Sequence, residues 1–176
     1  SAASDVYKRQ TTSYLIESAF RTAGHSVGMI GTTGSRINGV RVPSSLTTPE
    51  ASDLQRLFAT MRDDGVHRIV MEVSSHSLLL GRVGGTRFRI GAFLNLSQDH
   101  LDFHHTMEEY FQAKARLFTK DSGTCCDRAV ICIDDSWGLR MRDIAEASGC
   151  TPVTVSTTGN ADYSCLLYTS DAADDS

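Results

Sequence analysis

Residues 69–73 read Ile-Val-Met-Glu-Val, a run of strand type that is apolar except for one carboxylate. Further apolar runs lie at 27–30, 90–96, 129–133 and 153–155. Short apolar runs bounded by turn residues are typical of strands that are covered on both faces. The sequence therefore predicts a buried sheet built around residues 69–73.

Segments with helical spacing of apolar residues alternate with these runs, at 14–23, 107–118 and 137–148. A fourth helix is expected from Thr48, as N-cap, and Pro49, in the first turn, to Gly65. Alternating strands and helices predict an α/β fold of three layers, a mainly parallel sheet flanked by helices. Ligands of such sheets bind beyond the carboxyl ends of the strands, so polar residues that follow strands are the candidates for a site.

The two ends of the chain have the character of foreign sequence. Residues 1–10 (SAASDVYKRQ) and 165–174 (CLLYTSDAAD) can be encoded by one DNA element in opposite orientations. That element resembles the transposase adapter of sequencing libraries. We therefore expect one evolved domain over residues 11–164, between adapter-derived residues 1–10 and 165–176, and we leave both ends out of the expected fold.

Charge and composition exclude several classes of partner. The chain has 17 Lys and Arg against 21 Asp and Glu, a net charge of −4, so no strong positive field attracts nucleic acid or anionic lipid. No apolar stretch approaches the roughly 20 residues of a membrane helix, and the N-terminus lacks the apolar centre of a secretory signal. These features predict a cytoplasmic protein with neither nucleic acid nor membrane as a partner.

Four cysteines lie within residues 11–164, at Cys125, Cys126, Cys132 and Cys150. The adjacent pair has no second close pair, so the spacing is not that of a zinc ribbon. Without a secretory signal the thiols are expected to be reduced. The sequence assigns them no role.

Two acidic or histidine-rich segments follow predicted strands. Glu72 interrupts an apolar strand, where a carboxylate is costly unless a metal, a basic side chain or nearby hydroxyls such as those of Ser74 and Ser75 partner it. Residues 99–105 hold three His and two Asp, with His100 and His104 four apart. The segment lacks the HExxH pattern of zinc hydrolases, so a hydrogen-bonded loop or a hard-metal site shared with Glu72 fits better than zinc.

Lys114 falls within the apolar stripe of the helix at 107–118, seven residues after Met107. One interpretation is a lysine whose stem is buried while its ammonium reaches water. The other is a partly buried amine that reacts with CO₂ to give a carbamate, an anionic oxygen ligand for Mg²⁺. Thr47 and Thr48 likewise allow two interpretations, contacts to an anionic substrate at a helix N-terminus or simple N-capping.

Four motifs occur in a fixed order: LTTPEA (46–51), VMEVSSHSLLLGRV (70–83), FLNLSQDHLDFH (93–104) and YFQAKARLF (110–118). In this order and spacing they closely resemble the central ATPase domain of the Mur ligases. Within that family they are most similar to the branch that adds the third amino acid of the peptidoglycan stem. The resemblance covers nearly all of residues 11–164.

The resemblance implies a role for each matching position. Glu72 and His100 would be Mg²⁺ ligands, and Lys114 would be the carbamylated catalytic lysine that supports the metal site. The positions that match substrate-binding residues are Thr47, Thr48, Ser74 and Arg82. The implied cosubstrate is ATP, with Mg²⁺ as cofactor. The partners would be a UDP-N-acetylmuramoyl dipeptide and a diamino acid, either diaminopimelate or lysine, in the bacterial cytoplasm, with the protein a monomer.

The implied reaction is phosphoryl transfer from ATP to the D-glutamate carboxylate, followed by attack of an amine on the acyl phosphate. Three departures bear on it. Leu80 stands where some members have Gln. The phosphate loop GTxGKT is expected directly before Thr11, but residues 1–10 occupy that place, and Gln10 stands where the family has the Thr that binds Mg²⁺. Lys8 beside Thr11 and Thr12 imitates that loop but belongs to the excluded end. The outer domains are also missing, so we expect the 176-residue chain alone to be inactive.

Other functions stay open at this point. A ligase with the same central domain, such as the alanine-adding, glutamate-adding or folylpolyglutamate branch, is the nearest, and the LTTPEA and MEVSSH pair argues against it. A metal-binding hydrolase could use His100, His104 and Glu72. A non-catalytic nucleotide-binding module would leave Lys114 unmodified.

Overall fold

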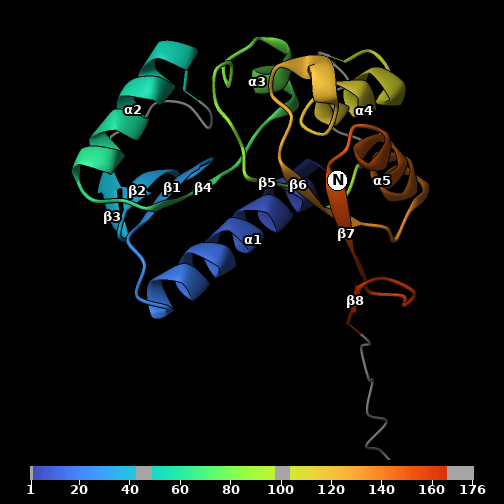
Figure 1. Cartoon of the computed structure of the whole chain (residues 1–176), viewed down its shortest axis with the longest axis horizontal. Helices are drawn as coiled ribbons and strands as arrows, with labels where there is room; N and C mark the ends of the chain where they lie inside the picture. The colour runs from blue at the N-terminus through green and yellow to red at the C-terminus, as the bar shows by residue number, and fades with distance from the viewer. Residues whose placement is uncertain (1, 43–48, 98–103, 166–176) are drawn as a thin grey trace, which may run out of the picture.

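The computed structural model describes residues 2–42, 49–97 and 104–165, with side chains from residue 7 onward, and confirms the α/β class (Figure 1). Helices alternate with mainly parallel strands, as predicted. The helices are α1 (Ala2–Thr22), α2 (Ala51–Asp63), α3 (Ser75–Leu79), α4 (Met107–Ala115) and α5 (Ser136–Ala147), with a short 3-10 turn η1 (Lys120–Ser122). The strands are β1 (Val27–Gly31), β2 (Gly34–Ile37), β3 (Val40–Val42), β4 (Arg68–Met71), β5 (Ile90–Phe93), β6 (Arg128–Cys132), β7 (Thr151–Ser156) and β8 (Tyr163–Ser164).

The strands form two four-stranded sheets, in the orders β3-β2-β1-β4 and β5-β6-β7-β8. In the first sheet β1 pairs in parallel with β4, while β2 and β3 add as antiparallel neighbours. The second sheet is parallel throughout. Its central strand β6 is bracketed by β5 and β7, so the segments that follow these strands emerge at one edge of the sheet.

The hairpin of β2 and β3 is a feature that the predicted strands do not include. Its turn is Asn38-Gly39, with φ of 51° and 85°, the left-handed values that a two-residue hairpin turn requires. The Asn38 side chain also accepts a hydrogen bond from the backbone N–H of Val27 at 2.8 Å. An Asn-Gly pair is a strong hairpin signal in a sequence, and hydrophobic periodicity alone overlooks it because β2 and β3 are only four and three residues long.

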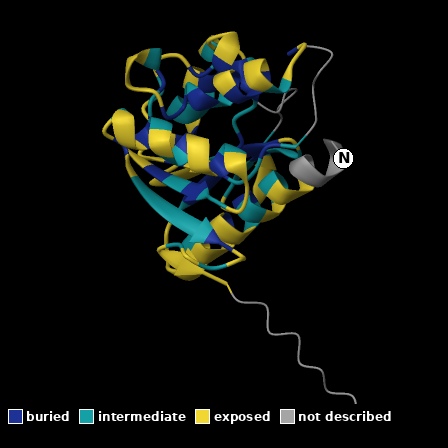
Figure 2. Cartoon of the chain, turned by 90° about the vertical axis from the view of Figure 1, so that its right-hand side faces the viewer, coloured by how far each residue is buried: buried dark blue, intermediate teal, exposed yellow. Residues whose placement is uncertain are grey.

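One hydrophobic core joins the two sheets. It includes Ile30 and Leu54 on the side of the first sheet and Phe93, Ile131 and Met141 on the side of the second, all at most 4% exposed. Figure 2 shows the buried residues on the inner faces of the helices and the exposed residues on their outer faces. The fold thus buries a continuous apolar centre, which is the main favourable contribution to folding.

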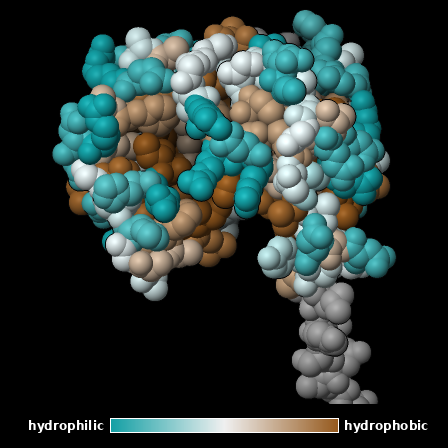
Figure 3. Space-filling model, viewed as in Figure 1, coloured by the Kyte–Doolittle hydropathy of each residue, from teal (hydrophilic) through white to brown (hydrophobic). Residues whose placement is uncertain are grey.

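Some apolar side chains remain at the surface of the first sheet. Val40 is 71% exposed and Ile69 is 40% exposed. In Figure 3 hydrophobic residues are visible beside α1, where the first sheet lies in that view. Scattered exposed apolar residues are common in soluble folds.

The first helix is longer than the sequence predicts. α1 starts at Ala2, whereas apolar spacing within residues 11–164 predicts a start at residue 14. Residues 2–13 contain neither Gly nor Pro, so nothing in them stops a helix from extending toward the N-terminus. α1 packs against β1 and β4, and in Figure 1 it runs diagonally across the view. None of the helices in the described part of the chain is long and apolar enough to cross a membrane.

The helix after Pro49 also differs at its start. α2 begins at Ala51 with Glu50 as its N-cap, and the Glu50 side chain makes no capping hydrogen bond. The expected N-cap, Thr48, lies outside the described residues. At its other end α2 stops at Asp63 and the chain turns through Gly65, with φ of 74°, as the sequence predicts.

Candidate active site

Glu72 lies directly after β4 and is 3% exposed. Its carboxylate accepts a hydrogen bond from the hydroxyl of Thr32 at 2.8 Å and another from the Thr32 backbone N–H at 3.2 Å. The sequence suggests hydroxyl partners on Ser74 or Ser75, and the structure gives Glu72 a hydroxyl partner in Thr32, directly after the neighbouring strand β1. Two donors on one residue fix the carboxylate in orientation, which a buried anion requires.

Gly31 makes room for this carboxylate at the carboxyl end of β1. A Cβ atom at residue 31 would lie within 3.0 Å of the Glu72 Cδ atom and closer still to Oε1. The close approach of backbone and carboxylate is what allows the Thr32 N–H to reach Glu72. This gives the Gly31-Thr32 turn a structural reason that composition alone does not supply.

The segment after Glu72 forms the short helix α3. Ser74 is its N-cap, and the Ser74 Oγ accepts a hydrogen bond from the N–H of Ser77 at 3.1 Å. The next residue, Ser75, is 2% exposed and lies 2.7 Å through its Oγ from Nε2 of His104. The predicted substrate residue Ser74 therefore also has a local structural task.

His104 connects this helix to α4. It is 2% exposed, stacks on the Tyr110 ring with centroids 5.0 Å apart, and meets the ring of His76 edge-on at 5.4 Å. Lys114 also contacts the Tyr110 ring, with its Nζ 4.7 Å from the ring centroid. The segments that follow β4 and β5 thus meet through one packed group, which we name the His104 cluster: Ser75, His76, His104, Tyr110 and Lys114.

Lys114 occupies the position that helical spacing predicts. Tyr110, Phe111, Leu117 and Phe118 of the same stripe are buried, and Lys114 between them is half-buried. α4 itself ends at Ala115, three residues before the predicted end at 118. An ammonium over an aromatic face is a favourable contact, so the unmodified lysine is held against the cluster.

Arg82 follows α3 and pairs with the start of α2. Its Nη2 lies 2.8 Å from Oε1 of Glu50. Its Nε is buried and has no hydrogen-bond partner among the described residues. The motifs that contain Pro49-Glu50 and Arg82, more than thirty residues apart, therefore lie side by side.

Three predicted site residues, Thr47, Thr48 and His100, fall outside the described residues. Within the described ranges no group of three or more His, Cys, Asp or Glu side chains could hold a metal ion. Glu72 still suits Mg²⁺ chemically, because it offers anionic oxygen, the donor that Mg²⁺ prefers, at the end of a strand. A metal site here would need ligands beyond Glu72.

Comparison with known proteins identifies the family. A family model described as the Mur ligase middle domain matches residues 9–173. The chain belongs to this family. Two curated relatives are named UDP-N-acetylmuramoyl-L-alanyl-D-glutamate--2,6-diaminopimelate ligase. The protein of Corynebacterium glutamicum is 59% identical over 157 residues, covering 89% of this chain and 30% of the relative. That of Streptomyces coelicolor is 47% identical over 154 residues, covering 88% and 29%.

The fold of this Mur ligase middle domain is similar to that of a solved structure. That structure carries the same ligase name, with a TM-score of 0.74 and 35% identity, and the match covers 86% of this chain and 31% of that one. The chain spans about a third of the length of the relatives that it matches. The resemblance of the four motifs to the Mur ligases is confirmed.

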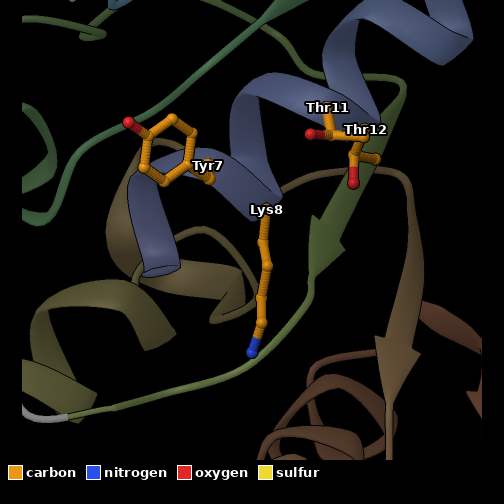
Figure 4. Close-up of a pocket in the computed structure, with 4 residues that line it drawn as sticks. All are labelled: Tyr7, Lys8, Thr11 and Thr12. Atoms are coloured by element: carbon orange, nitrogen blue, oxygen red, sulfur yellow. The ribbon is translucent and has the colours of Figure 1, made fainter. Parts of the chain in front are cut away.

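The N-terminal part of α1 lines a pocket but does not have the form of a phosphate loop. Tyr7, Lys8, Thr11 and Thr12 line an open pocket of about 420 Å³. All four lie on α1, and Figure 4 shows Lys8 pointing away from the two threonine hydroxyls. A phosphate loop presents unpaired backbone N–H groups, which a continuous helix does not offer.

Asp134 and Asp135, which follow β6, have structural partners. Asp134 accepts hydrogen bonds from the hydroxyls of Ser156 and Thr157, both at 2.6 Å. These bonds, Ser156 first, lower the pKa of Asp134 to about 2. Asp135 is the N-cap of α5. Both carboxylates follow β6, and their bonds tie the carboxyl end of that strand to β7 and α5.

Residues that the sequence did not single out carry much of this geometry. They are Thr32 beside Glu72, Tyr110 beside Lys114, and Glu50 beside Arg82. A sequence signal exists for Tyr110, since it lies four residues before Lys114 on one helix face. The contacts of Thr32 and Glu50 are long-range and have no local signal.

Proposed function

We propose that this chain is the central part of an ATP-dependent ligase that joins diaminopimelate to UDP-N-acetylmuramoyl-L-alanyl-D-glutamate in peptidoglycan synthesis. The observation that carries the proposal is the 59% identity over 157 residues to a ligase of that name. Its relatives named here are bacterial, and we assign the reaction to the bacterial cytoplasm. Their names favour diaminopimelate over lysine as the amino acid added.

Glu72 is proposed as a Mg²⁺ ligand together with His100. When bound, Mg²⁺ would neutralise phosphate charge during phosphoryl transfer. The support from this chain is a buried carboxylate whose orientation is set by two donors of Thr32. Thr32 would act as the positioning residue, because a donor that bonds to a metal ligand keeps the remaining lone pairs of that ligand directed at the metal.

Lys114 is proposed as the carbamylated lysine of the site. Its half-buried position beside Tyr110 supports this role, because the amine is held in one place on the apolar face of α4. The Lys114 ammonium first loses one proton, and the neutral amine then forms a bond from Nζ to the carbon of CO₂ and loses a second proton, so that an anion replaces a cation. The new carboxylate would extend past the ring toward the metal site.

The proposed substrate residues are Thr47, Thr48, Ser74 and Arg82. Arg82 has the best physical case. Glu50 holds one terminal nitrogen, and the buried Nε has no partner among the described residues. A buried donor without an acceptor is costly, so a carboxylate or phosphate oxygen of the substrate would satisfy it. Leu80, 57% exposed, offers no polar contact beside it.

The chemistry then follows from positioning. The γ-phosphoryl group of ATP passes to the terminal carboxylate of the substrate, and the amine of diaminopimelate attacks the acyl carbon with release of phosphate. Arg82 would orient the anionic substrate. Glu72 and Lys114 would form part of the Mg²⁺ site, where the phosphate charge is neutralised. Fixing reactants and charges in this way is the largest contribution that proteins make to phosphoryl transfer.

A graft tests the proposed function. Residues 11–164 of this chain replace the matching segment of the Corynebacterium glutamicum ligase, which keeps the rest of that protein. We expect formation of the tripeptide nucleotide, with ADP and phosphate released in equal amounts, when diaminopimelate is supplied. Lysine in its place should give little product. A folded chimera without ligation would refute the proposal, and a preference for lysine would refute the choice of amino acid.

A further inference from the structure

Three cysteines gather at the amino ends of the second sheet, away from the carboxyl ends where the candidate site lies. Cys125 and Cys126 precede β6, and Cys150 directly precedes β7. The two strands are parallel neighbours with Arg128 opposite Thr151. Residues 25 apart in the sequence are therefore brought to the same corner of the sheet.

Two of these thiols face one another. The Sγ atoms of Cys125 and Cys150 are 3.2 Å apart. Both thiols point at the same acceptor, since Cys150 donates to the carbonyl oxygen of Cys126 at 3.0 Å and Cys125 donates to it at 3.5 Å. Cys150 is 3% exposed, while Cys125 is of intermediate exposure and accessible from solvent. The shared carbonyl holds the two sulfur atoms close together, and a disulfide would shorten their separation to about 2 Å.

Cys126 has a different environment although it is adjacent in sequence. Its Sγ packs toward β5, where a Cβ atom at Gly91 would lie 2.8 Å from it. No group of three or more cysteine, histidine or acidic side chains in the described residues is arranged to hold a metal. The cluster is therefore better suited to a bond between two thiols than to a metal site.

We propose that Cys125 and Cys150 are a modification site, an oxidisable dithiol that forms a reversible disulfide with low-molecular-weight disulfides such as oxidised glutathione. The Cys125 thiolate, the more accessible of the two, attacks one glutathione sulfur and releases one glutathione thiolate. The Cys150 thiolate then attacks the Cys125 sulfur and displaces the second. Two protein thiols lose two electrons and two protons, and the oxidised glutathione becomes two molecules of reduced glutathione.

The first step is slow and the second is fast. Burial, followed by the hydrogen bond with Cys150, raises the pKa of Cys125 to about 12, so little thiolate exists at neutral pH. Once Cys125 carries glutathione, its neighbour is already in place, and closure is intramolecular. The protein should therefore show the internal disulfide rather than a stable mixed disulfide.

Peptide mapping of the 176-residue chain, with Cys165→Ser to remove the exposed thiol, tests the site. Trypsin cleavage after Lys120, Arg128 and Arg142 separates Cys125 and Cys126 from Cys150. After incubation with oxidised glutathione at pH 8.5, we expect residues 121–128 linked to residues 143–176 with the mass of both less two hydrogens. Dithiothreitol should separate them.

Two serine variants decide which cysteine is bonded. Cys125→Ser should abolish the linked peptide, whereas Cys126→Ser, the matched control on the same peptide, should keep it. Closing the loop should raise Tm by roughly 6–10 °C, in a way that dithiothreitol reverses. A linkage lost in Cys126→Ser, a persistent glutathione adduct at Cys125, or a linked product with a lower Tm would overturn the proposal.

Discussion

Two glycines on different strands make room for two very different buried side chains. At the carboxyl end of β1, Gly31 allows the Glu72 carboxylate to lie against the backbone. Near the amino end of β5, Gly91 allows the Cys126 thiol to do the same. Both neighbours are almost fully buried, at 3% exposure each.

The difference lies in what surrounds each side chain. Hydrogen bonds from Thr32 fix the orientation of the Glu72 carboxylate. The residues of the polar His104 cluster lie on the segments that follow β4 and β5. The Cys126 thiol lies with the Phe118 ring at Gly91, and the two other thiols bond to the backbone carbonyl oxygen of Cys126. At the carboxyl ends of the strands, burial and hydrogen bonds hold polar groups in fixed orientations, which catalysis requires. At the amino ends of the strands, the buried side chains contribute packing. Substitutions at the carboxyl ends should affect activity most, and those at the amino ends only stability.

Lys114→Ala in the grafted ligase should give the largest effect. We expect at least about a 100-fold loss of kcat with an unchanged circular dichroism spectrum, because the group that supports the metal site is removed. Short carboxylates such as acetate should restore part of the rate. The matched control is Lys120→Ala, an exposed lysine of η1 in the same region, which should retain full activity. Equal rates for the two variants would remove Lys114 from the site.

His104→Ala should have the largest effect on stability. It removes the ring stacked on Tyr110 and leaves the buried Ser75 hydroxyl without its 2.7 Å partner. A loss of about 2–3 kcal/mol in the free energy of unfolding is expected from urea titration of the 176-residue chain. The neighbouring His105 is exposed, and His105→Ala should change stability by less than about 0.5 kcal/mol. Similar losses at both positions would contradict the cluster as described.

Gly91→Ala tests the packing at the opposite edge. The added Cβ meets the Cys126 Sγ at 2.8 Å and the Phe118 ring at 3.2 Å, so a cost of about 1–3 kcal/mol is expected without any loss of grafted ligase activity. Cys126→Ala in the same chain should relieve about 1 kcal/mol of that cost, measured as the coupling in a double-mutant cycle. If the effects of Gly91→Ala and Cys126→Ala on stability were additive, the Cys126 thiol would not be the group that clashes with the added Cβ atom.

The sequence predicts the parts of the molecule that depend on local pattern. Alternating apolar segments establish the α/β class, and helical spacing places Lys114 on the buried side of α4, where the structure has it. Periodicity does not extend to loops, so nothing local distinguishes buried His104 from exposed His105. The 3.2 Å approach of Cys125 and Cys150 depends on the register of β6 against β7, which only tertiary structure supplies.

Helix and turn boundaries show a similar division. Gly65 ends its helix as predicted, because a left-handed residue acts locally. The start of α2 shifts from Thr48 to Glu50, and there the ion pair with Arg82 is a long-range contact. The Asn38-Gly39 turn is a local signal that apolar patterning alone does not use. Sequence rules therefore predict a helix or turn boundary correctly where the contacts that determine it lie within a few residues of each other in the chain.

Asp134→Asn should give the smallest effect, and it concerns pH. Hydrogen bonds from Ser156 and Thr157 lower the pKa of Asp134 from 3.8 to about 2. A lowered pKa stabilises the folded state above the unfolded value, and this contribution fades as pH falls from about 4 to about 2. The variant should therefore have a Tm a little below the parent at pH 6 and equal to it near pH 2.

The control is Asp121→Asn, an exposed acidic residue in η1. The Tm of Asp121→Asn should equal that of the parent over the same pH range, because the contacts described for Asp121 include no hydrogen bonds from a pair of hydroxyls. Asp134 is exposed, so solvent screens its interactions and the difference in Tm is small. A Tm difference for Asp134→Asn that stays constant down to pH 2 would mean that the hydroxyl contacts, and not the charge, tie β6 to β7 at the carboxyl edge.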